Sequence, residues 1–410
     1  MKAIVELLFI VACIGLFAGC EKEKDFLPNE GLAELKAAKI MVMPCASTDV
    51  LTKAEADWAN INEALQNSKQ GETVQLGEGT FFLHKSIVCW DFNGTLKGAG
   101  IGKTIVQTAP DMIFNIDECP PVNWSFENNS GAFMFCFAHD YFEGEKTVSV
   151  LDLSIIVDEP TPTRPKGSAG INSMHAIMVL HTGFDNDREN PVDLNVTYKN
   201  LSVKGEYDEK YLYEKYSLFS ALSGYGNSNG TFEVKNVLVE NASGCIKPHA
   251  FMGKNAQVVI KNSYLNNCVR GIYSFYNHSW IIQNNKIKNS KNAIAMLGKG
   301  GGEPWEGPEG SSCVKDNWIC FAGGVGIGMQ YIKNVDVKNN NIEGSGFGIA
   351  SVGGENFAII NNDLCGVSPR PIFIGSLINS EIKNNANQII LGPGASHPSI
   401  TIGESRECDD

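Results

Sequence analysis

A short pattern recurs nine times along the chain and limits its fold more than any single residue does. A copy has an apolar residue, a variable residue, Asn or Asp, two variable residues and a second apolar residue, and only the last copy departs, with Asn387 in place of the second apolar residue. The central polar residues are Asp152, Asn200, Asn236, Asn262, Asn284, Asp316, Asn339, Asn361 and Asn384. From Asn262 onward they are separated by 22, 32, 23, 22 and 23 residues. A repeat of this period indicates a solenoid, in which each unit packs on its neighbours.

Each repeat contains short strand-like segments, which are too rich in Asn and Gly to form a pair of helices. An isoleucine usually follows the central polar residue after ten or eleven positions. These landmark residues are Ile246, Ile272, Ile294, Ile327, Ile349 and Ile372. Three strands per turn fit this spacing best. Because coils of a solenoid stack about 4.8 Å apart, Asn side chains at one corner can form a hydrogen-bonded ladder. Asn also tolerates the left-handed backbone of a sharp corner, so we expect these residues to be structural.

The coils at 258–275, 280–297 and 335–352 resemble those of the right-handed parallel β-helix family, also called pectate-lyase-like. The resemblance implies an all-β fold, a right-handed parallel β-helix solenoid, over residues 51–405, followed by a tail at 406–410. A helical pattern at Ala54–Asn67 places Trp58, Ile61 and Leu65 on one face. Many proteins of this family begin with a helix that caps the first coil. We therefore expect an N-terminal capping helix.

The N-terminus resembles a bacterial lipoprotein signal. A short apolar stretch ends in Leu16-Phe-Ala-Gly-Cys20, with Phe17 where such signals usually have Leu. The resemblance implies a signal peptide at residues 1–19, cleavage before Cys20 and lipidation of the Cys20 sulfur. Residues 20–50 are then expected to be a lipid anchor and linker. This predicts a protein at the bacterial outer membrane or cell surface, held to the membrane by its lipid anchor alone.

Composition argues against some ligands and leaves others open. The formal net charge of -13 makes nonspecific nucleic-acid binding an unfavourable interpretation, although a local basic groove for an acidic polymer remains open. The cysteines lack a Cys-x-x-Cys pair, so we expect most to be buried apolar residues, with a few disulfides left open. Asp185, Asp187 and Glu189 form a weak calcium-like cluster without the glycine of a defined calcium loop. We expect no required cofactor and keep calcium as an alternative.

The family resemblance implies that substrate lies along the sheet formed by the landmark strands. If each landmark isoleucine points inward, the first and third residues after it point outward. These outward positions are Lys247 and His249, Tyr273 and Phe275, Ala295 and Leu297, Gly328 and Gln330, Ala350 and Val352, and Phe373 and Gly375. The side chains capable of acid–base chemistry fall on two adjacent coils.

Insertions concentrate near the same coils. The step from Asp152 to Asn200 is 48 residues and the step from Asn200 to Asn236 is 36. The added segments are 157–172, 181–193, 204–217 and 298–312. Long loops on a rigid scaffold often carry function, so we expect them to wall a groove beside the outward positions. Aromatic residues of these loops that could pack on sugar rings are Tyr207, Tyr211, Tyr213 and Trp305.

This combination of side chains suits β-elimination from a uronic-acid polymer. Such a reaction needs a cation beside the carboxylate, a base for the neighbouring proton and an acid for the departing oxygen. We assign Lys247 or Arg270 to the cation, His249 to the base and Tyr273 to the acid. The further residues expected to bind substrate are Phe275, His278, Trp305 and Gln330.

Two other functions remain open from the sequence. A glycoside hydrolase needs two carboxylates, and none of the twelve outward positions is Asp or Glu, so its acids would come from loops. A non-catalytic glycan-binding or scaffold protein would share the anchor, repeats and aromatic loops without needing a base. Pro248 interrupts strand pairing, so Lys247-Pro-His249 is also consistent with a plain surface bulge. Whether the protein is an enzyme stays open, and a polysaccharide lyase is favoured over a hydrolase.

Overall fold

In the computed structural model, all nine central polar residues of the repeat occupy corners between strands. Their backbone φ angles lie between 51° and 57°. This left-handed conformation is unfavourable for most residues and is tolerated by Asn and Asp. The structural role expected for the repeat is therefore confirmed, and the steps in the sequence measure the lengths of successive coils.

The structure describes most of the unit that runs from Ala37 to Asp410. The described residues are 39–110, 113–115, 132–140, 144–158, 161–163, 174–181, 192–208, 216–226, 228–249, 251, 255–276, 278–298, 312–364, 367, 370–385, 389–391 and 400–402. The predicted lipid anchor at Cys20 lies outside these residues and stays a prediction, which labelling with a fatty acid would test. Among the described residues, no helix is long and apolar enough to span a membrane.

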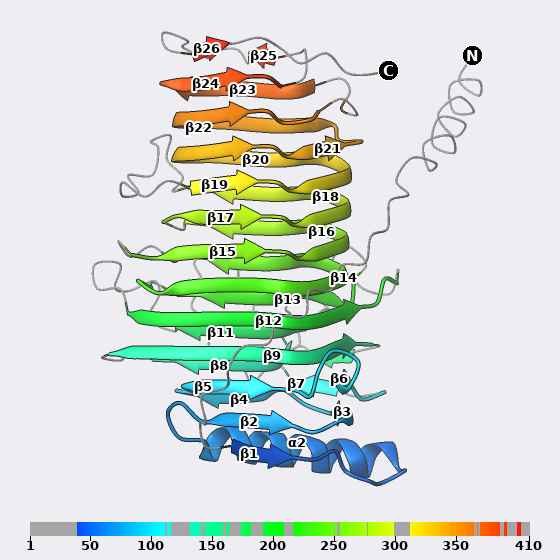
Figure 1. The fold of residues 1–410 in the computed structure, drawn as a ribbon. Helices are drawn as coiled ribbons and strands as arrows, with labels where there is room; N and C mark the ends of the chain where they lie inside the picture. Colours follow the sequence, from blue (N-terminus) through cyan, green and yellow to red (C-terminus); the bar gives the residue numbers. More distant parts are fainter. Residues whose placement is uncertain are drawn as a thin grey trace, which may run out of the picture. The chain divides into compact units, whose positions relative to one another are not determined.

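Parallel pairing joins the described strands into a 24-stranded sheet that winds into stacked coils (Figure 1). The sheet bends at the corners and forms three faces. The first face precedes the corner residues and contains β1 (Lys39–Val42), β2 (Thr73–Leu76), β5 (Gly94–Lys97), β15 (Gln257–Lys261), β17 (Trp280–Gln283), β19 (Ser312–Lys315), β24 (Ser380–Lys383) and β26 (Ile400–Ile402). The second face follows the corners and contains β3 (Gly79–Leu83), β6 (Thr104–Thr108) and β21 (Asn341–Glu343).

The third face carries the landmark isoleucines. It contains β4 (Ile87–Trp90), β8 (Ala132–His139), β11 (Met174–His181), β13 (Leu218–Tyr225), β23 (Arg370–Ile378) and β25 (Ile389–Leu391). Longer strands pass through the bends and contribute to more than one face: β9 (Glu145–Val157), β12 (Asp193–Gly205), β14 (Thr231–His249), β16 (Tyr264–Phe275), β18 (Lys286–Leu297), β20 (Trp318–Lys338) and β22 (Phe347–Ile360). A separate parallel pair is formed by β7 (Ile113–Asn115) and β10 (Thr161–Thr163). The fold is thus a parallel β-helix, as predicted.

The interior consists of aligned apolar side chains. All six landmark isoleucines are fully buried, and they lie opposite one another in successive strands of the third face. Because alternate residues of a strand point to opposite faces, this register confirms the inward direction that the sequence predicts for the landmarks. Their neighbours at the first and third positions are therefore directed outward.

The continuous amide ladder lies one residue beyond the predicted corner. Its members are Asn285, Asn317, Asn340, Asn362 and Asn385, all nearly fully buried. Each Nδ2 donates to the Oδ1 of the next member at 2.9–3.0 Å. Corner residues also pair, as from Asn200 Nδ2 to Asp152 Oδ1 at 2.8 Å, but their side chains are more exposed. The structure confirms the predicted ladder of Asn side chains, but the continuous ladder is formed by the residue after the corner and not by the corner residue itself.

A helix covers the first coil, as predicted, and starts earlier than the periodicity indicated. Helix α2 (Val50–Asn67) begins after Asp49, whose side chain accepts a hydrogen bond from the Thr52 backbone N at 2.8 Å. This is a helix N-cap. The buried Asp57 side chain accepts from the backbone N of Cys45 at 2.6 Å and of Phe82 at 2.9 Å. These contacts fix the helix to the residues before it and to strand β3.

Two strands of the N-terminal half lie outside the regular repeat. Lys39–Val42, placed in the linker by the sequence, forms β1 and pairs in parallel with β2, so the linker prediction is wrong for these residues. Strand β8 pairs with both β4 and β11 in the third face. These strands lack the spaced landmarks of the later coils, so a period-based prediction does not find them.

Three of the described cysteines take part in disulfides. Cys245 and Cys268 form one between β14 and β16, with their Cα atoms 6.3 Å apart, and Cys320 is also disulfide-bonded. Cys89 and Cys136 are buried and take part in no disulfide, as expected for most of the cysteines. The bond between Cys245 and Cys268 joins the two strands that carry the predicted site residues.

Candidate functional site

The predicted catalytic residues lie on two adjacent strands of the third face. Strands β14 and β16 pair so that Ile246 lies opposite Ile272 and His249 opposite Phe275. Lys247 therefore stands beside Tyr273 on the outer side of the sheet. We call the outward side chains of this region the strip, which consists of Phe219, Lys247, His249, Arg270, Tyr273 and Phe275.

His249 lies among aromatic rings and is neutral near pH 7. Its ring centroid is 5.2 Å from Tyr225, 5.1 Å from Phe275 and 5.6 Å from Tyr276. Burial, together with a smaller effect of the charge of Lys247, lowers the pKa of His249 to about 3. A neutral imidazole retains a lone pair, so His249 is in the protonation state that a proton acceptor requires.

Lys247 is more buried than the sequence suggested, with 6% of its surface exposed. Its Nζ lies 3.7 Å from the centroid of Phe219, a cation–π contact. The side chain runs across Gly244, where an added Cβ would collide with Cε of Lys247. Glycine at this position is therefore needed for the observed direction of Lys247. The charge of Lys247 reaches both neighbouring histidines, because it lowers the pKa of His249 and of His175.

Arg270 and Tyr273 complete the cationic part of the strip. The Arg270 Cζ lies 4.8 Å from the ring centroid of Tyr273. Tyr273 packs edge-on against Phe275 at 4.2 Å, and Phe275 contacts His249 in turn. A phenol, an imidazole and a guanidinium are thus linked through direct ring contacts on two neighbouring strands.

His175 belongs to the same surface and was missed by the sequence reasoning. Only 5% of its surface is exposed. Its ring lies between those of Phe133 and Phe219, and each centroid-to-centroid distance is 5.0 Å. Burial lowers its pKa well below the usual value, and Lys247 adds to this effect. Its strand β11 pairs Ile177 with Leu222, which pairs with Ile246. His175 lies two residues before the inward-pointing Ile177, so strand alternation would have assigned it to the inner side, and the register shift between Met174 and His175 breaks that pattern.

The remaining predicted residues are dispersed. His278 is buried between β16 and β17, where its backbone N donates to Phe251 O at 2.8 Å. Gln330 is exposed on β20 and lies opposite Leu297, so β18 separates it from Phe275. Tyr207 is exposed and packs against Tyr216 at 5.1 Å. The predicted residues outside the described part of the chain are Trp305, Tyr211, Tyr213, Asp185, Asp187 and Glu189.

The described residues contain no group of three or more His, Cys, Asp or Glu side chains placed to hold a metal ion. The weak calcium candidates at 185–189 lie outside these residues, so calcium binding there stays a prediction.

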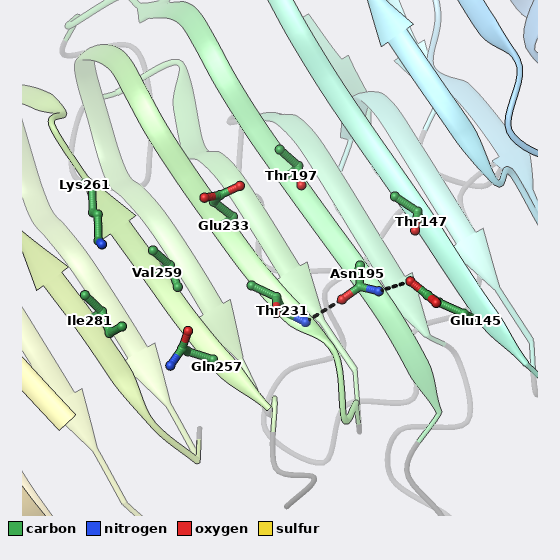
Figure 2. Close-up of a pocket in the computed structure, with 10 residues that line it drawn as sticks. All are labelled: Glu145, Thr147, Asn195, Thr197, Thr231, Glu233, Gln257, Val259, Lys261 and Ile281. Carbon is green, nitrogen blue, oxygen red and sulfur yellow. Dashed lines mark hydrogen bonds between the residues drawn. The ribbon is translucent and has the colours of Figure 1, made fainter. Parts of the chain in front are cut away.

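A polar hollow of about 540 Å³ lies on the first face and was not predicted (Figure 2). It crosses five strands, from β9 to β17, and its lining includes Thr147, Thr197 and Lys261. Asn195 Nδ2 donates to Glu145 Oε1 at 2.7 Å on one side of it. The hollow and the strip belong to different faces of the same coils.

The buried His139 makes the stability of the fold sensitive to acid. Burial lowers the pKa of His139 to about 3, with smaller effects from Lys146 and His181, while Asp91 lies 3.9 Å away. Since the folded-state pKa lies below the ordinary value of 6.5, the stabilising contribution is complete above pH 6.5. It decreases as the pH falls toward 3. We expect the free energy of unfolding to fall by about 2 kcal/mol at pH ~5 from His139 alone.

Urea unfolding at neutral and acidic pH measures this effect, with His139→Gln as the comparison because glutamine does not titrate. We expect the variant to lose less stability on acidification than the unaltered protein. Equal losses in the two proteins would contradict the assignment to His139.

Comparison with known proteins agrees with the fold. A family model described as a right handed beta helix region matches residues 216–364. The A-module of mannuronan C-5 epimerase AlgE6 from Azotobacter vinelandii is 13% identical, with a TM-score of 0.49 over 87% of this chain and 96% of that chain. DFA-IIIase from Arthrobacter chlorophenolicus A6 is 12% identical, with a TM-score of 0.42 over 85% of this chain and 91% of that chain.

A search of curated proteins found no match. The strand order and the register define the chain as a parallel β-helix with an N-terminal capping helix, and the family model matches residues 216–364 of it as a right-handed β-helix region.

Proposed function

We propose that this protein is a carbohydrate-active β-helix that cleaves a uronic-acid polymer by β-elimination at the strip. The observation that carries the proposal is the grouping of two cations, a neutral imidazole and a phenol on the outer sides of β14 and β16. A fold of this kind supports many activities, so the activity depends on these side chains.

The reaction can be written with each group in one role. Lys247 and Arg270 neutralise the uronate carboxylate, which stabilises the negative charge that develops when the adjacent carbon loses its proton. His249 accepts that proton, and the electrons of the broken C–H bond form a carbon–carbon double bond. The bond to the departing glycosidic oxygen breaks, and Tyr273 supplies a proton to this oxygen.

The low pKa of His249 is consistent with this role because substrate changes its surroundings. The charge of Lys247 contributes to the lowered pKa in the free protein. A substrate carboxylate beside Lys247 would offset that charge and raise the pKa of His249. The imidazole would therefore be a stronger base in the complex than in the free protein. A stronger base removes the substrate proton more readily.

A two-carboxylate hydrolase fits the described residues less well. Such enzymes place two carboxyl groups roughly 5 to 10 Å apart on either side of the scissile bond. The described side chains of the strip include no Asp or Glu. A hydrolytic mechanism would thus require acids from segments beyond those described.

The proposal is tested by incubating the purified full-length protein with uronic-acid and neutral polysaccharides. An unsaturated product, followed by its ultraviolet absorbance, is the expected result with a uronic-acid polymer. New reducing ends without unsaturation would indicate hydrolysis, and binding without turnover would indicate a non-catalytic glycan-binding protein. Either outcome would overturn the lyase assignment.

A further inference from the structure

Lysines form an aligned row on the outer side of the first face. Strand pairing places residues 97, 151, 199, 235, 261, 283, 315, 338, 360 and 383 opposite one another in successive coils. Seven of these ten positions are lysines, which we call the lysine row: Lys97, Lys199, Lys235, Lys261, Lys315, Lys338 and Lys383. Neighbouring strands lie about 4.8 Å apart, so lysines on consecutive strands, such as Lys199, Lys235 and Lys261, are spaced at that interval.

The middle of the lysine row lacks acidic partners among the residues that the structure describes. Lys97, Lys338 and Lys383 pair with carboxylates at 3.7, 2.8 and 2.7 Å. Lys199, Lys235, Lys261 and Lys315 have no ion pair to any described residue. All four are partly exposed. Their ammonium groups are therefore accessible to a ligand.

The row of like charges is expected to destabilise the folded protein when no anion is bound. Like charges placed directly opposite on neighbouring strands repel each other, and Lys199, Lys235 and Lys261 occupy three consecutive strands. The chain as a whole is acidic, with a formal charge of -13, so this local excess of positive charge is not a consequence of composition. A linear anion lying along the solenoid axis would relieve the repulsion at several coils together.

The polar hollow adjoins the lysine row and adds hydrogen-bonding groups. Thr197 and Glu233 lie two residues before Lys199 and Lys235, and Lys261 itself lines the hollow. In Figure 2 their side chains project from three neighbouring strands onto one surface. Hydroxyl and amide groups of Thr231 and Gln257 extend this surface along β14 and β15. A ligand with alternating anionic and hydroxyl groups could use both parts.

We propose that the lysine row and the hollow form a second binding surface for a linear acidic polysaccharide. Carboxylates of the polymer would lie on the lysine row, and sugar hydroxyls would contact the threonine and amide side chains of the hollow. This surface holds the polymer on a different face from the strip, so one chain could remain attached while another segment reacts. The inference rests on the proposed function for the class of sugar, and it goes beyond it in assigning a site.

The chemistry of the surface favours a polysaccharide over a nucleic acid. Glu145 and Glu233 line the hollow, and their carboxylates would repel the closely spaced phosphates of a nucleic acid. The described lining contains no aromatic ring on which a base could stack. A polysaccharide with hydroxyl groups between its anionic groups carries more widely spaced charges and needs no aromatic ring for stacking of bases.

The test compares two triple variants of the full-length protein that remove the same charge. One is Lys199→Gln, Lys235→Gln and Lys261→Gln. The control is Lys69→Gln, Lys204→Gln and Lys291→Gln, three exposed lysines outside the lysine row. Binding to polygalacturonate and to alginate is measured by calorimetry at low and moderate salt, with neutral dextran and single-stranded DNA as comparison ligands.

We expect the first variant to bind polyuronate about tenfold more weakly at low salt, since exposed ion pairs each contribute modestly to affinity. The control should bind as the unaltered protein does. Salt should weaken binding by the unaltered protein more than binding by the first variant. Equal affinity of the two variants would overturn the proposal, as would DNA binding that is as tight as polyuronate binding and is lost in the same variant.

A His249→Gln variant separates this inference from the proposed function. Loss of turnover with retained, lysine-dependent polymer binding supports both assignments. Lysine-dependent binding without turnover by any form of the protein overturns the lyase function and supports the second surface. Turnover with binding that is insensitive to the lysine row overturns the second surface alone.

Discussion

Replacing Asn340 by alanine is expected to lower the free energy of unfolding by about 3–5 kcal/mol, because several buried polar groups lose their partners together. Asn340 is 1% exposed. Its Nδ2 donates to Val314 O and to Asn362 Oδ1, both at 2.9 Å. Its Oδ1 accepts from the backbone N and the Nδ2 of Asn317 at 3.1 and 2.9 Å. Alanine leaves the groups on both neighbouring coils without these bonds.

Denaturant unfolding monitored by circular dichroism measures the effect, and Asn339→Gly provides a matched control one residue away. Asn339 occupies the left-handed corner with a φ of 54°, which glycine also adopts. Its side chain makes one longer hydrogen bond, from Nδ2 to Asp316 Oδ1 at 3.3 Å. We expect the control to lose less than about 1 kcal/mol. Similar losses in the two variants would contradict a special role for the buried ladder.

The contrast between these adjacent residues explains why the sequence placed the ladder at the wrong position. Copies such as Asn284-Asn285 and Asn339-Asn340 contain two successive Asn, and the period is the same for either. In the structure the first turns the backbone through the left-handed region. The second points inward and bonds strand carbonyls such as Ile260 O and Val314 O. Periodicity determines the spacing of such pairs but does not distinguish these two roles.

The coils that sequence analysis described well are those whose strands follow each other at the basic period. There, the landmark isoleucine fixes which residues point inward and which point outward, because strand alternation is local. Strands β1 and β8 escape this reasoning, since insertions and unlike sequences separate them from the regular coils. Their positions depend on pairing with β2, β4 and β11, which are contacts between distant parts of the chain.

The sequence likewise predicted which side of the sheet the candidate site residues occupy, but not their contacts with residues of other coils. Alternation placed Lys247, His249 and Tyr273 on one outer surface, and the register of β14 and β16 agrees. It could not reveal that Lys247 would lie across Gly244 against Phe219, since that depends on a ring from another coil. The low pKa of His249 is likewise a result of burial and of the charge of Lys247. These properties arise from packing between coils.

Replacing His249 by glutamine is expected to lower kcat on a uronic-acid polymer by about 10²–10⁴-fold, the range associated with loss of a general base. The pH dependence distinguishes a base from a residue that merely packs between aromatic rings. In the free protein the pKa of His249 is about 3, so the acid limb of kcat/KM should lie at low pH. Substrate offsets the charge of Lys247, and the limb of kcat should therefore lie at higher pH.

Substituting Lys247 by glutamine tests the electrostatic part of this mechanism. Removing the positive charge eliminates one cause of the lowered pKa of His249, so the acid limb of kcat/KM should move upward in pH. The same substitution should reduce kcat/KM, because the carboxylate of the substrate loses a cation. Lys291→Gln removes a charge from an exposed residue elsewhere and should leave both the rate and the pH profile unchanged. Initial rates are measured across the pH range in which circular dichroism shows each protein to be folded. An unshifted acid limb in Lys247→Gln would exclude His249 as the base whose ionisation controls the reaction.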